Sequence, residues 1–100
     1  MLARVEADCE DGAAVLQAAL LACHECRIPV MTSWRHDFAP AGMTATIVLA
    51  ESHLTIETLP EHRLVLVDCT ICGKVAPDRP VREMARRLGG QVQRSEIRDR

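Results

Sequence analysis

The chain has 100 residues, a formal net charge of −2 and 48% hydrophobic residues, with one tryptophan, one phenylalanine and no tyrosine. A chain this short forms one domain and buries only roughly 60–65% of its unfolded surface, so pairing with a second copy would enlarge a thin core. The balanced charge disfavours steering to nucleic acid or membranes, and the scarcity of aromatic side chains disfavours a base-stacking surface.

Neither the N-terminus nor the cysteine content suggests export. The start, Met-Leu-Ala-Arg-Val, has no apolar segment behind a basic one, and no run reaches the about 18 apolar residues that a membrane span needs. Five cysteines, an odd number, suit a reducing compartment better than a disulfide framework. We therefore expect a cytoplasmic protein with no membrane partner.

The first two predicted elements are a strand and a helix. Apolar and polar residues alternate from Leu2 to Cys9, which predicts a strand. Asp11 follows as a helix cap, and apolar side chains then recur at helical spacing to about Cys26. Arg27 and Pro29 end this helix, because the residue before proline is disfavoured in the α region.

Strands separated by turn signals dominate the remainder. Four are predicted over residues 30–36, 43–50, 53–59 and 64–71. Pro77 and Pro80 open a second helix over 81–88, which Gly89-Gly90 stops. A last strand over 91–97 precedes a charged tail.

This element order predicts an α+β two-layer sandwich. Tight turns between successive strands indicate a mostly antiparallel sheet, with both helices on one face. The uncovered face would carry apolar residues, so we expect a homodimer that packs sheet to sheet in four αββα layers. No repeat or linker divides residues 1–100.

Two C-x-x-C motifs, Cys23 to Cys26 and Cys69 to Cys72, have the spacing of zinc ligands. The interval between the two motifs exceeds that of zinc ribbons, and Cys69 and Cys72 would leave opposite faces of a strand. Small buried thiols are therefore favoured over a metal site.

The C-terminal part is rich in arginine: Arg79, Arg82, Arg86, Arg87, Arg94, Arg98 and Arg100. Acidic residues are interleaved with these cations, and no aromatic residue accompanies them. A solvated helix face and tail is the favoured interpretation, and no nucleic-acid partner is expected.

The cluster Glu51-Ser52-His53 lies between two predicted strands. Neighbouring residues in a strand point to opposite faces, so His53 is poorly placed to activate Ser52, and no G-x-S-x-G elbow is present. Spacing alone thus indicates a polar turn and disfavours a conventional serine hydrolase.

A linked set of motifs surrounds this cluster, together with Val67-Asp68 and Cys72-Gly73: Phe38-Ala39-Pro40-Ala41-Gly42-Met43-Thr44, Ala50-Glu51-Ser52-His53-Leu54-Thr55-Ile56 and Thr58-Leu59-Pro60-Glu61. The set resembles the bacterial and archaeal S-adenosylmethionine decarboxylase proenzymes over residues 36 to 73, and the other elements match in order. Such a combination is more specific than any motif within it.

The resemblance implies that the Glu51–Ser52 bond cleaves itself, giving a 1–51 β chain and a 52–100 α chain. Ser52 would become a pyruvoyl group that forms a Schiff base with the substrate amine and withdraws electrons as carbon dioxide leaves. The zymogen would thus become a lyase that uses neither metal nor pyridoxal phosphate and supplies aminopropyl groups for spermidine biosynthesis.

The resemblance also assigns roles to other residues. Cys72 matches the proton donor for the substrate carbon, and Thr44 a hydroxyl residue that assists processing. Phe38 matches an aromatic that stacks on adenine, and Glu61 the carboxylate that holds the ribose hydroxyls. The family pairs its protomers so that each active site draws on both chains.

This sequence departs from the family pattern at three places. Glu57 replaces the histidine that removes the α proton during processing, and it can act as the base only where its surroundings let it exchange protons near neutrality. Leu59 replaces an aromatic wall of the nucleoside pocket, and a Gly-x-His sequence near the first strand is absent.

Three hypotheses about function follow. The first is a working S-adenosylmethionine decarboxylase that tolerates Glu57. The second is a pyruvoyl enzyme for a basic amino acid, arginine or ornithine, because Glu57 could pair with a cation and adenine stacking would be unnecessary. The third is an unprocessed paralogue that acts as a dimeric binding or regulatory protein.

Overall fold

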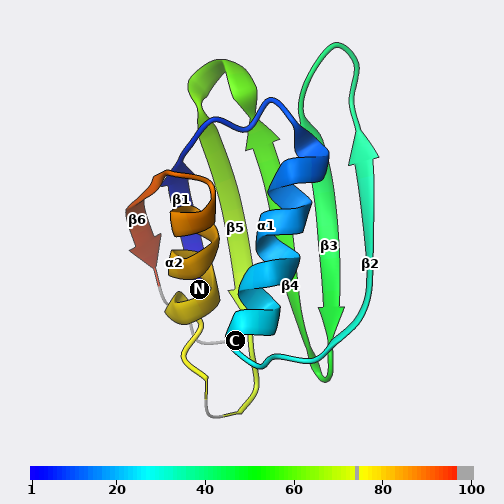
Figure 1. The fold of residues 1–100 in the computed structure, drawn as a ribbon, viewed down its shortest axis with the longest axis vertical. Coiled ribbons are helices and arrows are strands. Elements are labelled where there is room, and N and C mark those ends of the chain that lie inside the picture. Colours follow the sequence, from blue (N-terminus) through cyan, green and yellow to red (C-terminus); the bar gives the residue numbers. More distant parts are fainter. Residues whose placement is uncertain (74, 97–100) are drawn as a thin grey trace.

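The computed structural model describes residues 1–73 and 75–96 as one sheet, two α-helices and a short 3-10 helix (Figure 1). The elements are β1 (Leu2–Glu6), α1 (Gly12–Glu25), β2 (Val30–Asp37), β3 (Met43–Leu49), β4 (Ser52–Leu59), η1 (Pro60–His62), β5 (Leu64–Thr70), α2 (Asp78–Arg87) and β6 (Gln91–Glu96). The predicted order of strands and helices is confirmed. No helix in the described part of the chain is long and apolar enough to cross a membrane.

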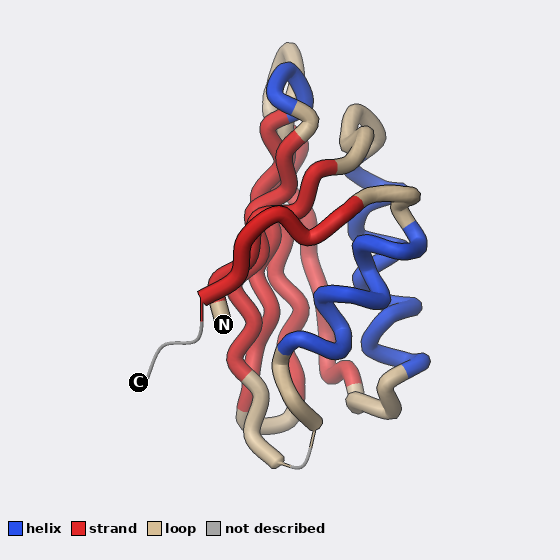
Figure 2. Tube along the Cα trace, turned by 90° about the vertical axis from the view of Figure 1, so that its left-hand side faces the viewer, coloured by secondary structure: helices blue, strands red, loops and turns tan. Residues whose placement is uncertain are grey.

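The six strands form a single sheet in the order β2-β3-β4-β5-β1-β6. Every pair of neighbours is antiparallel. Figure 2 shows both helices on one face of the sheet, with no element of the described chain on the other. The structure thus confirms the predicted α+β two-layer sandwich.

The core lies between the helices and the sheet. Alternate side chains of the central strands point to the helices and are almost fully buried, and they include Val5, Met43, Ile47, Leu54, Ile56, Val65 and Val67. Small residues on the facing side of α1, such as Ala19 and Ala22, are buried against them. Each of the buried valine, leucine, isoleucine and methionine side chains stabilises the fold by about 1.5–3 kcal/mol relative to an exposed one.

Element boundaries show where local patterns mislead. The predicted cap is confirmed, since the Ala14 N–H donates to Asp11 Oδ1 over 3.2 Å. The first strand, however, ends at Glu6, because Glu6 pairs with the first residues of both β5 and β6 and the ladders stop there.

The second helix begins three residues before the predicted start, at Asp78 rather than Val81. Pro80 therefore lies inside the first turn, where proline's missing N–H costs no hydrogen bond. Gly89 adopts the predicted left-handed conformation with φ +68°. The end predicted for the last strand, at residue 97, lies outside the described residues.

The face of the sheet away from the helices, called here the open face, carries the alternate set of side chains. By register and alternation they include Thr32, Trp34, His36, Thr44, Thr46, Val48, His53, Thr55, Glu57, Leu59, Leu66, Asp68 and Thr70. Trp34 is 53% exposed and Val48 is 37% exposed. Apolar groups are thus present on the face where a second copy is expected, and that assembly stays a prediction.

Candidate active site

The Glu51–Ser52 bond lies at a sharp turn between β3 and β4. Leu49 and Ser52 form the last pair of this ladder, so only Ala50 and Glu51 connect the two strands. Glu51 has φ +62°, a left-handed conformation that costs a residue with a side chain about 1–3 kcal/mol. The residue that supplies the carbonyl of this bond is therefore conformationally strained.

Two hydrogen bonds position the Ser52 hydroxyl. Its Oγ accepts from the backbone N–H of Cys72 over 2.9 Å and donates to the Ala50 carbonyl over 3.4 Å. The first bond joins the start of β4 to the segment after β5, although the two residues lie far apart in sequence. Ser52 is thereby held close to the peptide bond that precedes it.

The Cys72 thiol contacts the carbonyl of the same bond. Its Sγ donates to the Glu51 carbonyl oxygen over 3.4 Å. A donor at this oxygen would stabilise negative charge that develops there if the carbonyl carbon were attacked. Glu51, Ser52 and Cys72 together place a hydroxyl and a thiol donor beside the carbonyl of a residue with a strained backbone.

Cys72 differs from the other four cysteines. Cys72 is exposed, whereas Cys9, Cys23, Cys26 and Cys69 are buried. Burial raises the pKa of the Cys23 thiol to about 11 and the pKa of Cys69 to about 12. Such thiols stay protonated and inert near neutral pH. The described residues contain no group of three or more His, Cys, Asp or Glu side chains placed to hold a metal ion.

A cavity of about 180 Å³ adjoins Ser52 and Cys72. The chain leaving α1 contributes Arg27, Ile28 and Pro29 to its wall, and Leu49, Ala50, Ile71 and Val75 complete the lining. Figure 1 shows why these segments meet: the C-terminal end of α1, the β3–β4 turn and the end of β5 all lie at the lower edge of the sheet.

Phe38 lies at the opposite edge, in the turn between β2 and β3. The Phe38 N–H donates to the Gly42 carbonyl over 2.8 Å, and the Met43 N–H donates to Thr58 Oγ1 over 2.9 Å. These bonds fix the turn against the end of β4. The Phe38 ring contacts His36 edge-on, with 4.7 Å between ring centroids.

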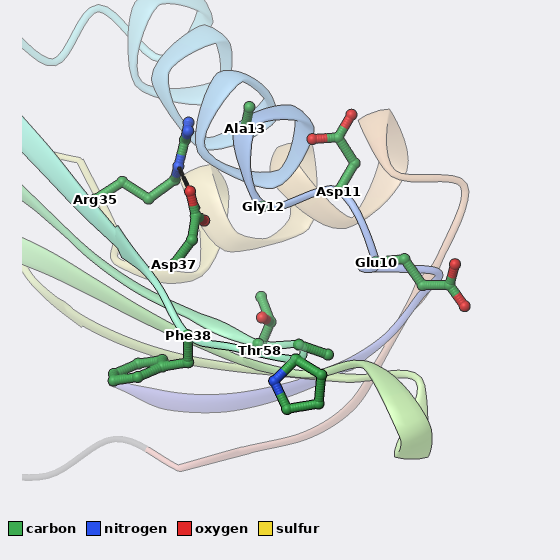
Figure 3. Close-up of a pocket in the computed structure, with 11 residues that line it drawn as sticks. Glu10, Asp11, Gly12, Ala13, Arg35, Asp37, Phe38 and Thr58 are labelled. Atoms are coloured by element: carbon green, nitrogen blue, oxygen red, sulfur yellow. Dashed lines mark hydrogen bonds and ion pairs between the residues drawn. The ribbon is translucent and has the colours of Figure 1, made fainter.

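Phe38 lines a cavity of about 500 Å³ beside the N-terminal end of α1 (Figure 3). Glu10, Asp11 and Asp37 are among the residues that line this cavity, and Arg35 pairs with Asp37 over 3.1 Å. An adjoining cavity of about 410 Å³ is lined by Glu61 and shares Glu10 with the first. The two residues expected to hold a nucleoside therefore line neighbouring cavities.

Thr44 and Glu57 are direct cross-strand partners, and both lie on the open face. Directly opposite residues have Cβ atoms about 4.5–5.5 Å apart, so the two side chains are neighbours. His36 pairs with Thr44 from β2 and extends this row; sequence reasoning did not single it out. Ser52 is five residues from Glu57 along β4, which corresponds to about 16 Å in an extended strand.

The predicted site residues thus form two groups at opposite edges of the sheet. One group is Glu51, Ser52 and Cys72, with Arg27 beside it. The other is Phe38, Thr44, Glu57 and Glu61. Ser52 and Glu57 also point to opposite faces, since Ser52 alternates with the buried Leu54 and Ile56. Within one chain, the two groups do not meet.

The family model described as S-adenosylmethionine decarboxylase matches residues 2–100. A protein of Pseudomonas paraeruginosa named S-adenosylmethionine decarboxylase proenzyme is 38% identical over 76 residues, which cover 75% of this chain and 48% of that protein. A protein of the same name from Oceanobacillus iheyensis is 40% identical over 78 residues, 77% of this chain and 59% of that protein.

The third relative, from Geobacillus sp. (strain WCH70), has the same name and is 40% identical over 57 residues, 57% of this chain and 46% of that protein. The matched region is thus about half the length of the Pseudomonas and Geobacillus proteins. The crystal structure of the adenosylmethionine decarboxylase from Aquifex aeolicus superposes with a TM-score of 0.75 at 23% identity, over 98% of this chain and 92% of that one. This likeness supports the fold.

Proposed function

Because the chain belongs to the S-adenosylmethionine decarboxylase family, we propose that it is a proenzyme that cleaves its own Glu51–Ser52 bond and becomes a pyruvoyl-dependent decarboxylase. The observation that carries this proposal is the contact set at that bond. The Ser52 hydroxyl is fixed by the Cys72 N–H, and the Cys72 thiol donates to the Glu51 carbonyl. A peptide bond that follows a residue with a strained φ, and that has an adjacent hydroxyl and an oxyanion donor, is suited to acyl transfer.

Self-cleavage would proceed by acyl transfer to the Ser52 hydroxyl, then elimination, then hydrolysis. Ser52 Oγ attacks the Glu51 carbonyl carbon, the C–N bond breaks, and the freed amine takes a proton, so the amide becomes an ester. A base then removes the Ser52 α proton, the Cβ–Oγ bond breaks, and the Glu51 carboxylate leaves with the electron pair. The Cα=Cβ enamine that results takes a proton at Cβ and becomes an imine. Water adds to the imine and ammonia departs, which leaves the pyruvoyl group at the new N-terminus.

The pyruvoyl carbonyl supplies the electron-withdrawing chemistry that loss of carbon dioxide requires. The chain's own residues do the rest. Cys72, exposed beside Ser52, is placed to deliver a proton to the substrate carbon after decarboxylation. Phe38 offers a half-exposed ring for adenine, and Glu61 a carboxylate for the ribose hydroxyls.

A complete site would require two copies of the chain. The distance between Ser52 and Glu57, about 16 Å along the strand, is too long for proton transfer within one protomer. A two-fold dimer that packs one open face on the other can bring the Ser52 edge of one copy to the Phe38 edge of its partner. We propose that each site combines Ser52 and Cys72 of one chain with Phe38, Thr44, Glu57 and Glu61 of the other.

We propose S-adenosylmethionine as the substrate and aminopropyl donation to spermidine synthesis as the use of the product. Three acidic residues line the Phe38 cavity, Glu10, Asp11 and Asp37, together with one cation, Arg35. The excess of negative charge favours a cationic molecule, and S-adenosylmethionine carries a sulfonium. The same carboxylates would also accept arginine or ornithine, which stay the second hypothesis because Leu59 replaces an aromatic of the family pattern.

Carbon dioxide release from carboxyl-labelled substrates separates these possibilities. We expect release from S-adenosylmethionine at least about tenfold faster than from arginine or ornithine. The reason is that contacts of Phe38 with adenine and of Glu61 with the ribose would add binding energy to the attraction between opposite charges. The unlabelled competitor 5′-methylthioadenosine should inhibit, since it keeps the nucleoside. Faster release from arginine or ornithine would contradict the proposed substrate.

Replacing Glu57 by histidine is expected to speed processing. An imidazole exchanges protons near neutrality, so the cleavage half-time should fall roughly tenfold at pH 7. The half-time is measured by denaturing electrophoresis after a pulse of synthesis. Glu61→His is the matched control, at the same edge of the sheet, and should not accelerate cleavage. An unchanged half-time for Glu57→His would mean that proton removal at position 57 is not limiting.

A further inference from the structure

Arg27 occupies a position that favours glycine. It follows the last residue of α1 and its cap, and its backbone has φ +58°. Its N–H donates to the His24 carbonyl over 3.0 Å, and the next N–H, of Ile28, donates to the Cys23 carbonyl over 2.8 Å. Helices commonly end on such a left-handed residue, which is usually glycine because a Cβ is disfavoured there.

The same arginine lines the cavity at the cleavage site. It lines the cavity of about 180 Å³ that Ser52 and Cys72 also line, together with Ala50. Its side chain is exposed. The ion pairs within residues 1–73 and 75–96 involve Arg35, His62, Arg82, Arg86 and Arg87, and none involves Arg27. A cation without a carboxylate partner in the described chain therefore adjoins the cavity at Ser52.

We propose that Arg27 stabilises the carboxylate of Glu51 as it leaves Ser52 during processing. This inference rests on the proposed self-cleavage. In the elimination step, base takes the Ser52 α proton, a Cα=Cβ double bond forms, and the Cβ–Oγ electrons leave on the Glu51 carboxylate. A guanidinium pairs well with such a carboxylate and lowers the energy of the charge that develops on it. Arg27 stays protonated and takes part in no bond exchange.

The leaving carboxylate fits this cation better than the substrate's carboxylate does. Loss of carbon dioxide removes charge from the substrate carboxylate, so a cation paired with it would stabilise the ground state and slow the reaction. Elimination creates a carboxylate where an ester stood, so the same cation favours the transition state and the product. After cleavage, Arg27 would hold the new C-terminus of the β chain beside the cavity.

The test uses Arg27→Gly in the full chain, with hydroxylamine as a probe of the ester. We expect conversion to the pyruvoyl form to slow at least about tenfold. Hydroxylamine, which cleaves esters, should release an α chain that begins with serine, identified by intact mass. The melting temperature should stay equal or rise, because glycine adopts positive φ freely. A purely structural role for Arg27 predicts the opposite: a lower melting temperature and no trapped ester.

Two further variants complete the test. Arg63→Gly changes another arginine with positive φ, +51°, at the opposite edge of the sheet, and should process like the unsubstituted chain. Arg27→Lys keeps the charge and should restore at least half of the lost rate. Unslowed conversion of Arg27→Gly contradicts the role of Arg27 alone, whereas an unsubstituted chain that never cleaves contradicts both this inference and the proposed function.

Discussion

Replacing Ser52 by alanine is expected to leave the chain intact at 11.0 kDa, with no carbon dioxide release from any substrate. The alanine has no oxygen to attack the Glu51 carbonyl, so the ester cannot form and the pyruvoyl carbonyl has no precursor. The loss should be complete rather than partial. Of Ser33 and Ser52, the two serines whose side chains the structure describes, only Ser52 is held beside its own peptide bond, by the bonds from the Cys72 N–H and to the Ala50 carbonyl.

The fold should survive this change, because the Ser52 hydroxyl is at the end of a ladder and not in the core. Far-ultraviolet circular dichroism and the melting curve check that point. Ser33→Ala, on β2, is the matched control and should cleave at the normal rate. Cleavage of Ser52→Ala at the same bond would contradict the assignment of Ser52 as the pyruvoyl precursor.

Co-production of two defective variants, Ser52→Ala and Glu57→Gln, is expected to restore fast cleavage. A Ser52→Ala chain cannot cleave, and a Glu57→Gln chain should cleave slowly because its base is lost. In a mixed dimer with shared sites, one site combines Ser52 of the Glu57→Gln chain with Glu57 of the Ser52→Ala chain. That site is free of substitutions, so the Glu57→Gln chain should be cleaved there at the normal rate.

Equal amounts of the two chains, carrying different affinity tags, place about half of the Glu57→Gln chains in mixed dimers. In the unfractionated mixture, about that fraction of the Glu57→Gln chains should be cleaved fast and the rest slowly, as measured by intact mass. Glu57→Gln chains that co-purify through the tag of the Ser52→Ala chain should nearly all be cleaved fast. If each site were built within one chain, the mixture would contain no complete site. Glu57→Gln chains that stay slow in every mixture would therefore contradict the shared site.

Much of the fold could be predicted because its signals are local. Asp11 before a run of alanine and leucine indicates a capped helix, and alternating residues from Leu54 to Thr58 indicate which side of β4 faces the core. The prediction for the first strand is too long because its true end depends on other strands. Alternation continues past Glu6, whereas the ladder ends where the partner strands begin. Which strands pair is determined by the tertiary structure and not by the local pattern.

The site was less accessible to sequence reasoning. Motif resemblance indicated Ser52, Cys72 and Glu57 as one chemical unit, but the strand that separates Ser52 from Glu57 places them at different edges and faces of the sheet. The sequence indicates Arg27 only as part of a helix end, since no local sequence pattern reveals that α1 ends beside the β3–β4 turn. Such contacts depend on how the helix packs across the sheet, which residue spacing does not encode.

Denaturing mass spectrometry of the purified, unsubstituted protein is the most direct test of self-cleavage at Glu51–Ser52. We expect two chains of nearly equal mass, one ending at Glu51 and one beginning with a pyruvoyl group in place of Ser52. Reduction with borohydride should add two hydrogens to the second chain only. A single chain of 11.0 kDa after prolonged incubation would contradict self-cleavage.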